Sequence, residues 1–270
     1  MKNILGKIVE EKVRQIPTLR SAYDKGCFKM EMSKASGHHL PSERSLIKQL
    51  SSSSQIEVIA EIKRGSPSKG LFAKDLDVVN QAVQYAAAGA GAISVLTDKK
   101  FFYGGYDDLQ TVRPLVATPI LCKDFIIDEI QIDIAKSIGA DIILLIVAIH
   151  TPRRLKELLD YATSIGLEVL MEVNNKDELA VALDLDHPLI GVNNRNLKTF
   201  ETNIQVSLDL IKEVQKSDVY MISESGIRTA EDIKQLSEAG FKGVLVGESL
   251  IRSGVEGNLI NQMTGIGRCI

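Results

Sequence analysis

Charged side chains interrupt several otherwise apolar stretches of this chain, and each one stands at the carboxyl end of its stretch. The first stretch carries Glu61 and is followed by Lys63, the third carries Lys123, and the fifth carries Glu172. Ammonium and carboxylate groups that meet in one site can donate and accept protons in turn. The residue types therefore predict general acid–base chemistry, provided that the fold brings these stretches together.

Two later stretches end in polar groups of other kinds. Asn193 ends the sixth and is followed by Arg195, and the seventh ends in Glu224, Ser225 and Gly226. A structural ion pair is the alternative explanation for one such group of charges. Removing charges from water costs several kcal/mol per ion, however, and the same anomaly recurs at the end of five stretches. We therefore predict an active site where these ends meet.

Eight short, β-branched apolar segments must position these side chains. Their ranges are 56–62, 91–97, 119–125, 141–148, 167–173, 189–194, 219–225 and 243–249. Amphipathic segments of helical period separate them, and several end in a glycine, as helix C-termini do. Eight strand–helix units in this order predict an α/β fold, the parallel (β/α)8 TIM barrel. An open doubly wound sheet is the alternative that the periodicity leaves.

Barrel geometry decides which way the side chains point. Alternate residues of a barrel strand face the interior and the helix layer, so Ile59, Glu61 and Lys63 share one face. Ala60 and Ile62 then face the helices. Barrel active sites lie at the carboxyl ends of the strands. The charged ends should therefore converge in one mouth.

Three loops at this end add candidate binding groups. Gly226 follows the seventh strand, and Gly247 and Glu248 follow the eighth, where barrels often bind phosphate through backbone amides and helix N-termini. Simple tight turns are the alternative. The basic, hydroxyl-rich loop 64–70 is either a flap that closes over an anion or a solvated surface loop. The aromatic segment 101–105 is either a mobile wall or packing at the rim.

The residues before the first strand do not fit the repeat. They contain a predicted helix from Ile4 to Gln15 and a shorter one near Glu43 to Gln49. We expect residues 1–270 to form a single barrel domain, in which residues 1–55 are an N-terminal helical extension that covers the barrel.

Composition excludes several classes of function. The chain is 44% hydrophobic and 25% charged with a net charge of −3, which is typical of a globular protein. We expect no nucleic-acid partner, because there is no basic stripe, and no membrane partner, because no apolar run is long enough. Three widely spaced cysteines, Cys27, Cys122 and Cys269, predict neither disulfides nor a metal site, and favour a cytoplasmic location. The histidines are expected to be surface or structural residues: His38, His39, His150 and His187.

The segments at the predicted strand ends are also recognisable as a set. In chain order they read IAEIKRGSPSKG, SVLTDKKFFYGG, PILCKDFIIDEIQI, GADIILLIVA, IGVNNRNL, ISESGI and VLVGESL. The chain closely resembles the indole-3-glycerol-phosphate synthase family over essentially its whole length. Two departures are small: Gly65 stands where alanine or lysine is usual, and Asn174 where histidine is frequent. Neither position is assigned to chemistry.

The resemblance implies a reaction of tryptophan biosynthesis. Members convert 1-(2-carboxyphenylamino)-1-deoxyribulose 5-phosphate to indole-3-glycerol phosphate, with loss of carbon dioxide and water and without a cofactor. The implied partner is a phosphorylated small molecule, and we expect a monomer or a weak homodimer. The nearest alternative, a phosphoribosylanthranilate isomerase, relies on a cysteine after strand one and an aspartate after strand five, where this chain has Glu61, Lys63 and Glu172. A non-catalytic phosphate-binding barrel would not need these groups.

The resemblance also implies a role for each residue. Lys123 corresponds to the general acid of ring closure and Glu172 to the general base of dehydration. Lys63 would hold the substrate carboxylate and can also donate a proton, Glu61 would orient Lys63 or take part in proton transfer, and Asn193 would bond the reacting hydroxyl. Partial burial is expected to move lysine pKa values toward neutral. The remaining predicted residues complete the polar ring (Arg195, Glu224 and the catalytic Ser225), bind phosphate (Ser66, Gly226, Gly247 and Glu248) and form the wall for the anthranilate ring (Phe125, Leu144 and Leu197).

Overall fold

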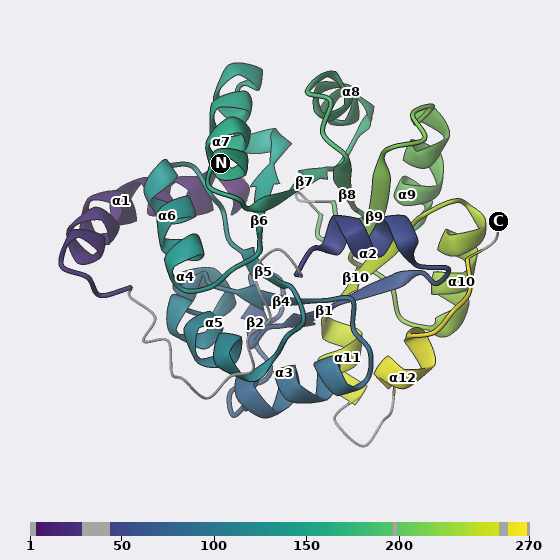
Figure 1. The fold of residues 1–270 in the computed structure, drawn as a ribbon, viewed down its shortest axis with the longest axis horizontal. Coiled ribbons are helices and arrows are strands. Elements are labelled where there is room, and N and C mark those ends of the chain that lie inside the picture. Colours follow the sequence, from purple (N-terminus) through teal and green to yellow (C-terminus); the bar gives the residue numbers. More distant parts are fainter. Residues whose placement is uncertain (1–3, 29–43, 197–198, 254–258, 269–270) are drawn as a thin grey trace.

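Eight parallel strands close into a barrel, in the order β1-β10-β9-β8-β7-β6-β5-β4 (Figure 1). The computed structural model describes residues 4–28, 44–196, 199–253 and 259–268. The strands are β1 (Glu57–Ile62), β4 (Ala92–Leu96), β5 (Ile120–Lys123), β6 (Ile142–Ile146), β7 (Glu168–Val173), β8 (Leu189–Asn193), β9 (Tyr220–Glu224) and β10 (Gly243–Val246). The closed order confirms the predicted barrel and rules out the open sheet.

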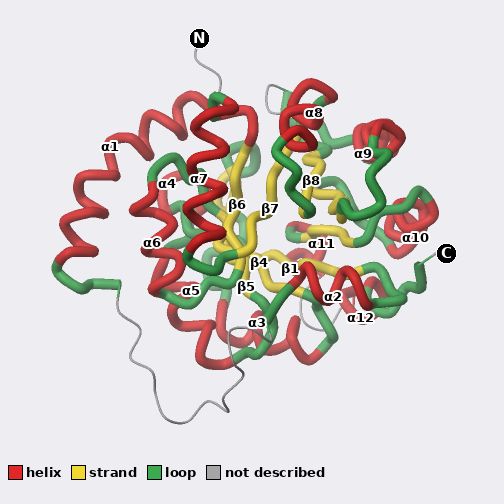
Figure 2. The backbone as a smooth tube through the Cα atoms, turned by 45° about the horizontal axis from the view of Figure 1, so that its top comes forward, coloured by secondary structure: helices red, strands yellow, loops and turns green. Residues whose placement is uncertain are grey.

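Helices surround the barrel as an outer layer (Figures 1 and 2). They are α3 (Val78–Ala87), α4 (Lys99–Phe102), α5 (Tyr106–Val112), α6 (Glu129–Ser137), α7 (Pro152–Ser164), α8 (Lys176–Asp184), α9 (Gln205–Leu210), α10 (Ala230–Glu238), α11 (Glu248–Ser253) and α12 (Leu259–Met263). Local sequence defines their ends. Asp128 and Gln131 form a capping box at the start of α6, and Gly139 follows the helix with a φ of 92°.

The alternation within strands is as predicted. Ile59 belongs to the apolar cluster inside the barrel, whereas Ala60 and Ile62 belong to the cluster between the strands and the helices. The inner cluster is aliphatic: it contains Leu121 and Leu170 with their neighbours on the other strands. Because this interior is filled with apolar side chains, charged groups fit only where the strands end.

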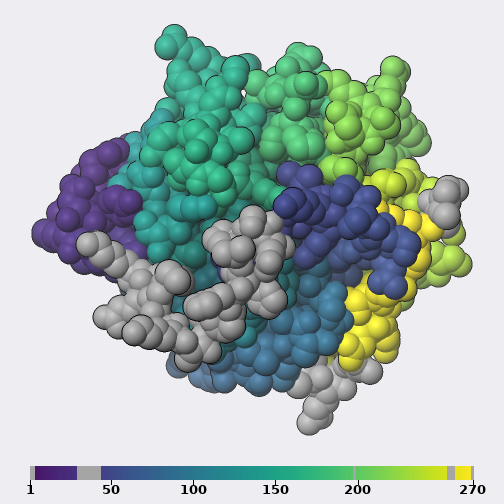
Figure 3. Space-filling view, viewed as in Figure 1, coloured from purple at the N-terminus to yellow at the C-terminus, as the bar shows by residue number. Residues whose placement is uncertain are grey.

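Helix α2 (Leu46–Ser52) closes the amino-terminal end of the barrel. Leu46 and Leu50 are buried in the inner cluster, so they fill the bottom of the barrel between the strands. The carboxylate of Glu168, at the start of β7, accepts hydrogen bonds from the amides of Leu46 and Ile47 at the start of the helix. In Figure 3 the dark-blue residues around α2 lie on the near face of the molecule, to the right of its centre.

Helix α1 (Ile4–Asp24) is longer than predicted and lies beside α6. The predicted helix ended at Gln15, and Pro17, which lacks an amide hydrogen, normally interrupts a helix. The helix continues because Ile16, Leu19 and Tyr23, spaced at helical intervals, pack against the apolar core. The gain from burying this face outweighs the one hydrogen bond that proline removes.

Among the described residues, no helix is long and apolar enough to cross a membrane. Two short strands, β2 (Gly65–Ser66) and β3 (Gly70–Leu71), form an antiparallel hairpin in the loop after β1. The loop after β1 is thus a folded structure.

We predict that Leu50→Ala lowers the free energy of unfolding by about 2–5 kcal/mol, because it leaves a cavity in the closed end of the barrel. The measurement is urea unfolding followed by circular dichroism. Leu115→Ala is the matched control: Leu115 is 52% exposed, and its truncation should change stability by no more than about 0.5 kcal/mol. Equal effects of the two substitutions on the free energy of unfolding would contradict the conclusion that α2 closes the amino-terminal end of the barrel.

Candidate active site

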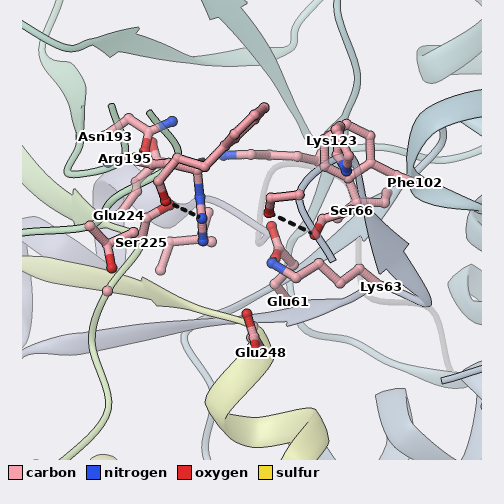
Figure 4. A pocket seen from close by; sticks show the side chains of 18 of the residues that line it. Glu61, Lys63, Ser66, Phe102, Lys123, Asn193, Arg195, Glu224, Ser225 and Glu248 are labelled. Atoms are coloured by element: carbon pink, nitrogen blue, oxygen red, sulfur yellow. Dashed lines mark hydrogen bonds and ion pairs between the residues drawn. The ribbon is translucent and has the colours of Figure 1, made fainter. Parts of the chain in front are cut away.

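A cavity of about 1060 Å³ opens at the carboxyl ends of the strands (Figure 4). The predicted site residues among the described part of the chain all line it: Glu61, Lys63, Ser66, Lys123, Phe125, Leu144, Glu172, Asn193, Arg195, Glu224, Ser225, Gly226, Gly247 and Glu248. Leu197, predicted as part of the apolar wall, lies outside the described residues. Residues from seven different strands, or from the positions just after them, thus converge in one mouth.

Lys123 lies at the centre of the charged groups. It extends from the last position of β5, and its ammonium contacts Glu224 Oε2 and lies 3.4 Å from Glu172 Oε2. All three side chains are largely buried, with exposed fractions of 12%, 2% and 7% for Lys123, Glu224 and Glu172. In this setting electrostatic attraction is much stronger than in water. The cluster holds the ammonium in one place.

The charges of the cluster control its protonation. Burial by itself would lower the pKa of Lys123, but the attraction of Glu224, Glu172 and Glu61 outweighs it and raises this pKa above its usual value. The expectation that burial brings lysine toward neutral is therefore wrong for Lys123. Burial raises the pKa of Glu224 to about 7, against the attraction of Lys123. Lys123 is thus charged at neutral pH.

A hydrogen-bonded chain orients Glu172 from the side of β8. Asn193 donates to Glu172 Oε1 at 3.1 Å, and its own oxygen accepts from the amide of Arg195 at 3.0 Å. Asn174, one of the two departures from the family pattern, donates to the carbonyls of Asn193 and Arg195 at 2.6 and 3.0 Å. Asn174 therefore supports the strand end that carries Asn193, a function that sequence reasoning missed.

Glu61 and Lys63 form an ion pair beside the last strand of the barrel. Burial opposes ionisation of Glu61, but Lys63 and Lys123 together lower its pKa. Gly247 makes this position possible, because a Cβ at residue 247 would lie 2.2 Å from Glu61 Oε1 and 3.0 Å from Lys63 Nζ. The ion pair and the backbone after β10 are therefore in direct contact.

The loops after β1, β9 and β10 meet on the same side of the cavity. Ser225 and Gly226 both have positive φ angles, 68° and 81°, a conformation that is strained for a serine. Ser66 in the hairpin lines the cavity, and the hairpin is joined to α11 by an ion pair between Lys69 and Glu248. The interpretation of loop 64–70 as a solvated surface loop is therefore wrong.

Part of the cavity lining is apolar. Phe102 of α4 and Phe125 after β5 have ring centroids 5.8 Å apart, and Leu144 of β6 lies with them in the lining. Of the two interpretations of segment 101–105, the wall of the site is confirmed for Phe102. Leu5 and Ile8 of α1, which sequence reasoning did not assign to the site, complete this part of the lining.

Two of the four histidines predicted to be surface or structural residues lie in the described part of the chain. His150 and His187 bond backbone carbonyls, of Ile126 and Val169, and line no part of the cavity. Cys27 and Cys122 are free thiols. His38, His39 and Cys269 lie outside the described residues.

The barrel, with a buried lysine between carboxylates and glycine-bearing loops beside an ion pair at the carboxyl ends of its strands, places the protein among the (β/α)8-barrel enzymes. Comparison with known proteins specifies the family. The family model for indole-3-glycerol phosphate synthase matches residues 5–263. The chain belongs to the indole-3-glycerol phosphate synthase family, which disfavours the isomerase and the non-catalytic barrel.

Curated relatives support the same assignment. The chain is 47% identical over 249 residues to the indole-3-glycerol phosphate synthase of Oceanobacillus iheyensis, covering 92% of each chain. It is 47% identical over 253 residues to that of Bacillus thuringiensis subsp. konkukian, covering 94% of each. An Exiguobacterium relative of the same name is 54% identical over 195 residues, covering 72% of this chain and 76% of the relative.

The raised pKa of Glu224 predicts how the stability of the folded protein changes with pH. Its folded value of about 7 lies above the ordinary 4.5, so the folded protein binds more protons between these pH values. The contribution of Glu224 to stability therefore falls as the pH rises from 4.5 to 7, by an amount on the order of 1–3 kcal/mol. Urea unfolding across this range should show that Glu224→Gln removes the downward slope.

Glu61→Gln is the matched control for that experiment. The pKa of Glu61 is lowered in the folded state, so its contribution is present above the ordinary value of 4.5 and is lost as the pH falls below it. The two variants should thus change the pH profile with opposite signs and in different windows. Parallel profiles for the natural protein and Glu224→Gln would show that the pKa of Glu224 is not raised.

Proposed function

We propose that this chain catalyses the closure of the indole ring on 1-(2-carboxyphenylamino)-1-deoxyribulose 5-phosphate, using the residues described above as its acid–base and binding groups. The observation that carries the proposal is the position of Lys123. Its ammonium lies between Glu172 and Glu224, in a cavity that both an aromatic wall and glycine-bearing loops line. A substrate with an aryl group at one end and a phosphate at the other fits this polarity.

Lys123 acts as the general acid of ring closure. The ring carbon that bears the carboxylate attacks the ribulose C2 carbonyl, and the oxygen of that carbonyl must gain a proton as the bond forms. Glu224 and Glu172 keep Lys123 protonated, because they raise its pKa. A lysine that stays charged in a buried site also stabilises the developing negative charge on the oxygen before transfer is complete.

Glu172 acts as the general base of the dehydration that follows decarboxylation. Asn193 fixes one oxygen of its carboxylate at 3.1 Å, and the other faces Lys123. The same contact lets Glu172 and Lys123 act on neighbouring atoms of the substrate. Asn193 is also placed to bond the hydroxyl that leaves as water.

Lys63 binds the substrate carboxylate that is later lost, and Glu61 holds Lys63 in place through their ion pair. Lys63 also lies beside Gly247, so its charge reaches toward the phosphate loops. The phosphate binds to the hydroxyl of Ser66 and the amides of Gly226, Gly247 and Glu248. The anthranilate ring lies against the apolar wall that contains Phe125 and Leu144. Arg195 and Ser225 complete the polar ring.

The remaining expectations belong to this proposal. Residues 1–270 act as one barrel domain with residues 1–55 as its extension, and the enzyme works in the cytoplasm as a monomer or weak homodimer. Family membership supports a phosphorylated small-molecule substrate. Light scattering on the purified protein tests the oligomeric state, since a stable higher assembly would overturn that part.

Purified protein given the carboxyphenylamino substrate should produce indole fluorescence. The protein has no tryptophan, so its own background is low. We predict that Lys123→Ala lowers kcat by about 10²–10⁴-fold, because ring closure loses its acid. Lys156→Ala is the control, since this lysine is 60% exposed on α7, and it should leave kcat unchanged. Near-normal kcat in a folded Lys123→Ala protein would refute the role given to Lys123.

A second prediction concerns the phosphate side. In Gly247→Ala the new Cβ would clash with Glu61 and displace the ion pair from the loop after β10. We expect the inhibition constant of inorganic phosphate, as a competitor of the substrate, to rise about 10-fold, which corresponds to about 1.4 kcal/mol. Gly267→Ala is the matched control, because a Cβ there meets no atom within 4 Å. Equal inhibition constants in both variants would place the phosphate elsewhere.

A further inference from the structure

A second buried ionic cluster lies next to the site, and the reaction as described does not use it. Lys12 of helix α1 extends between Asp98 and Asp124, at 2.9 Å from Asp98 Oδ2 and 2.6 Å from Asp124 Oδ1. The exposed fractions of the three side chains are 3%, 0% and 1%. Burying three charges is costly unless each is paired and hydrogen-bonded, so the cluster requires an explanation.

Each carboxylate of the cluster holds a different part of the apolar wall of the cavity. Asp98 follows β4, and its Oδ1 accepts from the amide of Phe101 at 2.6 Å, which caps the helix that carries Phe102. Asp124 follows Lys123 directly, and its Oδ1 accepts from the amide of Phe125 at 2.7 Å. The two phenylalanines of the apolar wall are therefore attached to the two partners of Lys12.

Asp124 is also fixed from the other side. Its Oδ2 accepts from Thr97 Oγ1 at 3.0 Å and from the hydroxyl of Tyr106 at 3.1 Å. Together with Lys12 and the amide of Phe125, these partners hold a carboxylate one residue from the proposed proton donor. Any displacement of Asp124 would therefore move the backbone that carries Lys123.

Lys12 holds the third part of the apolar wall, which is helix α1 itself. Ile8 and Leu5, one and two turns before Lys12, line the cavity. Two further ion pairs join α1 to the barrel, Lys100 with Glu11 and Arg20 with Asp128, but both involve an exposed cation, 53% and 55% accessible. Exposed pairs contribute little because solvent screens them. The buried cluster is the stronger attachment of the helix.

We propose that Lys12 is a positioning residue for ring closure: its ammonium, held between Asp98 and Asp124, fixes α1, Phe102 and Phe125 around the aryl half of the substrate. Burial by itself would lower the pKa of Lys12, but the two carboxylates outweigh it and raise this pKa, so the ammonium stays charged. The inference rests on the proposed function, because it concerns the same cavity and substrate.

The test compares Lys12→Met with Lys7→Met, a substitution of an exposed lysine on the same helix. We expect Lys12→Met to raise KM for the carboxyphenylamino substrate about 10-fold and to lower kcat by up to about 10²-fold, the loss expected when reacting groups move by about 1 Å. The inhibition constant of inorganic phosphate should not change, because no hydrogen bond or ion pair among the described residues joins the cluster to Ser66 or to the loops after β9 and β10. Lys12→Arg should recover most of the lost activity, because it restores the charge.

A second variant covers the case in which Lys12→Met does not fold. Lys12→Met combined with Asp98→Asn keeps the net charge of the cluster, and asparagine can still cap α4. This double variant should fold and show the same selective loss. Normal KM and kcat in a folded variant would overturn the proposal, as would an equal weakening of substrate and phosphate binding, which indicates general loosening. No turnover by the natural protein would overturn the proposed function as well, so the two failures are distinguishable.

Discussion

The electrostatic balance around Lys123 is the constraint on which the site depends. One ammonium lies between Glu224 and Glu172, with Glu61 near enough to add to their effect. A lysine buried to this degree without a partner would lose its proton. Two buried carboxylates without a cation beside them would each take up a proton. The ammonium of Lys123 and the carboxylates around it therefore depend on one another for their charge. The barrel must therefore bring several strands into register before any one of these residues is useful.

The register of the strands meets this demand by simple means. Asn193 of β8 and Glu224 of β9 are paired positions on neighbouring strands. Glu172 of β7 is paired in the same way with Ile146 of β6. Each polar residue thus comes at the level where the aliphatic interior ends. Because Leu46 and Leu50 close the opposite end, water and charge have access to the interior from the carboxyl side. Packing at one end thereby supports chemistry at the other.

Sequence reasoning predicted what depends on short-range pattern. Strand positions, the alternation of Glu61 with Ile62 and the convergence of the charged ends all follow from period two and from barrel geometry. It failed where distant contacts decide. The predicted helix ended too early, at Gln15, because the packing of the apolar face of α1 was not visible in the sequence. Lys12 looks like any solvated lysine of an amphipathic helix, since its partners lie more than 80 residues away. The raised pKa of Lys123 likewise depends on residues from three other strands.

The closed, aliphatic end of the barrel has a consequence for how such an enzyme can change. Among the described residues, none on α2 lines the cavity. Substitutions at this end thus alter how firmly the barrel holds together without touching the groups that meet the substrate. An engineer, or natural selection, can accumulate stabilising changes around Leu46 and Leu50 and later exchange them for new, destabilising residues in the loops opposite. The two ends of one short barrel can therefore evolve at different rates and for different reasons.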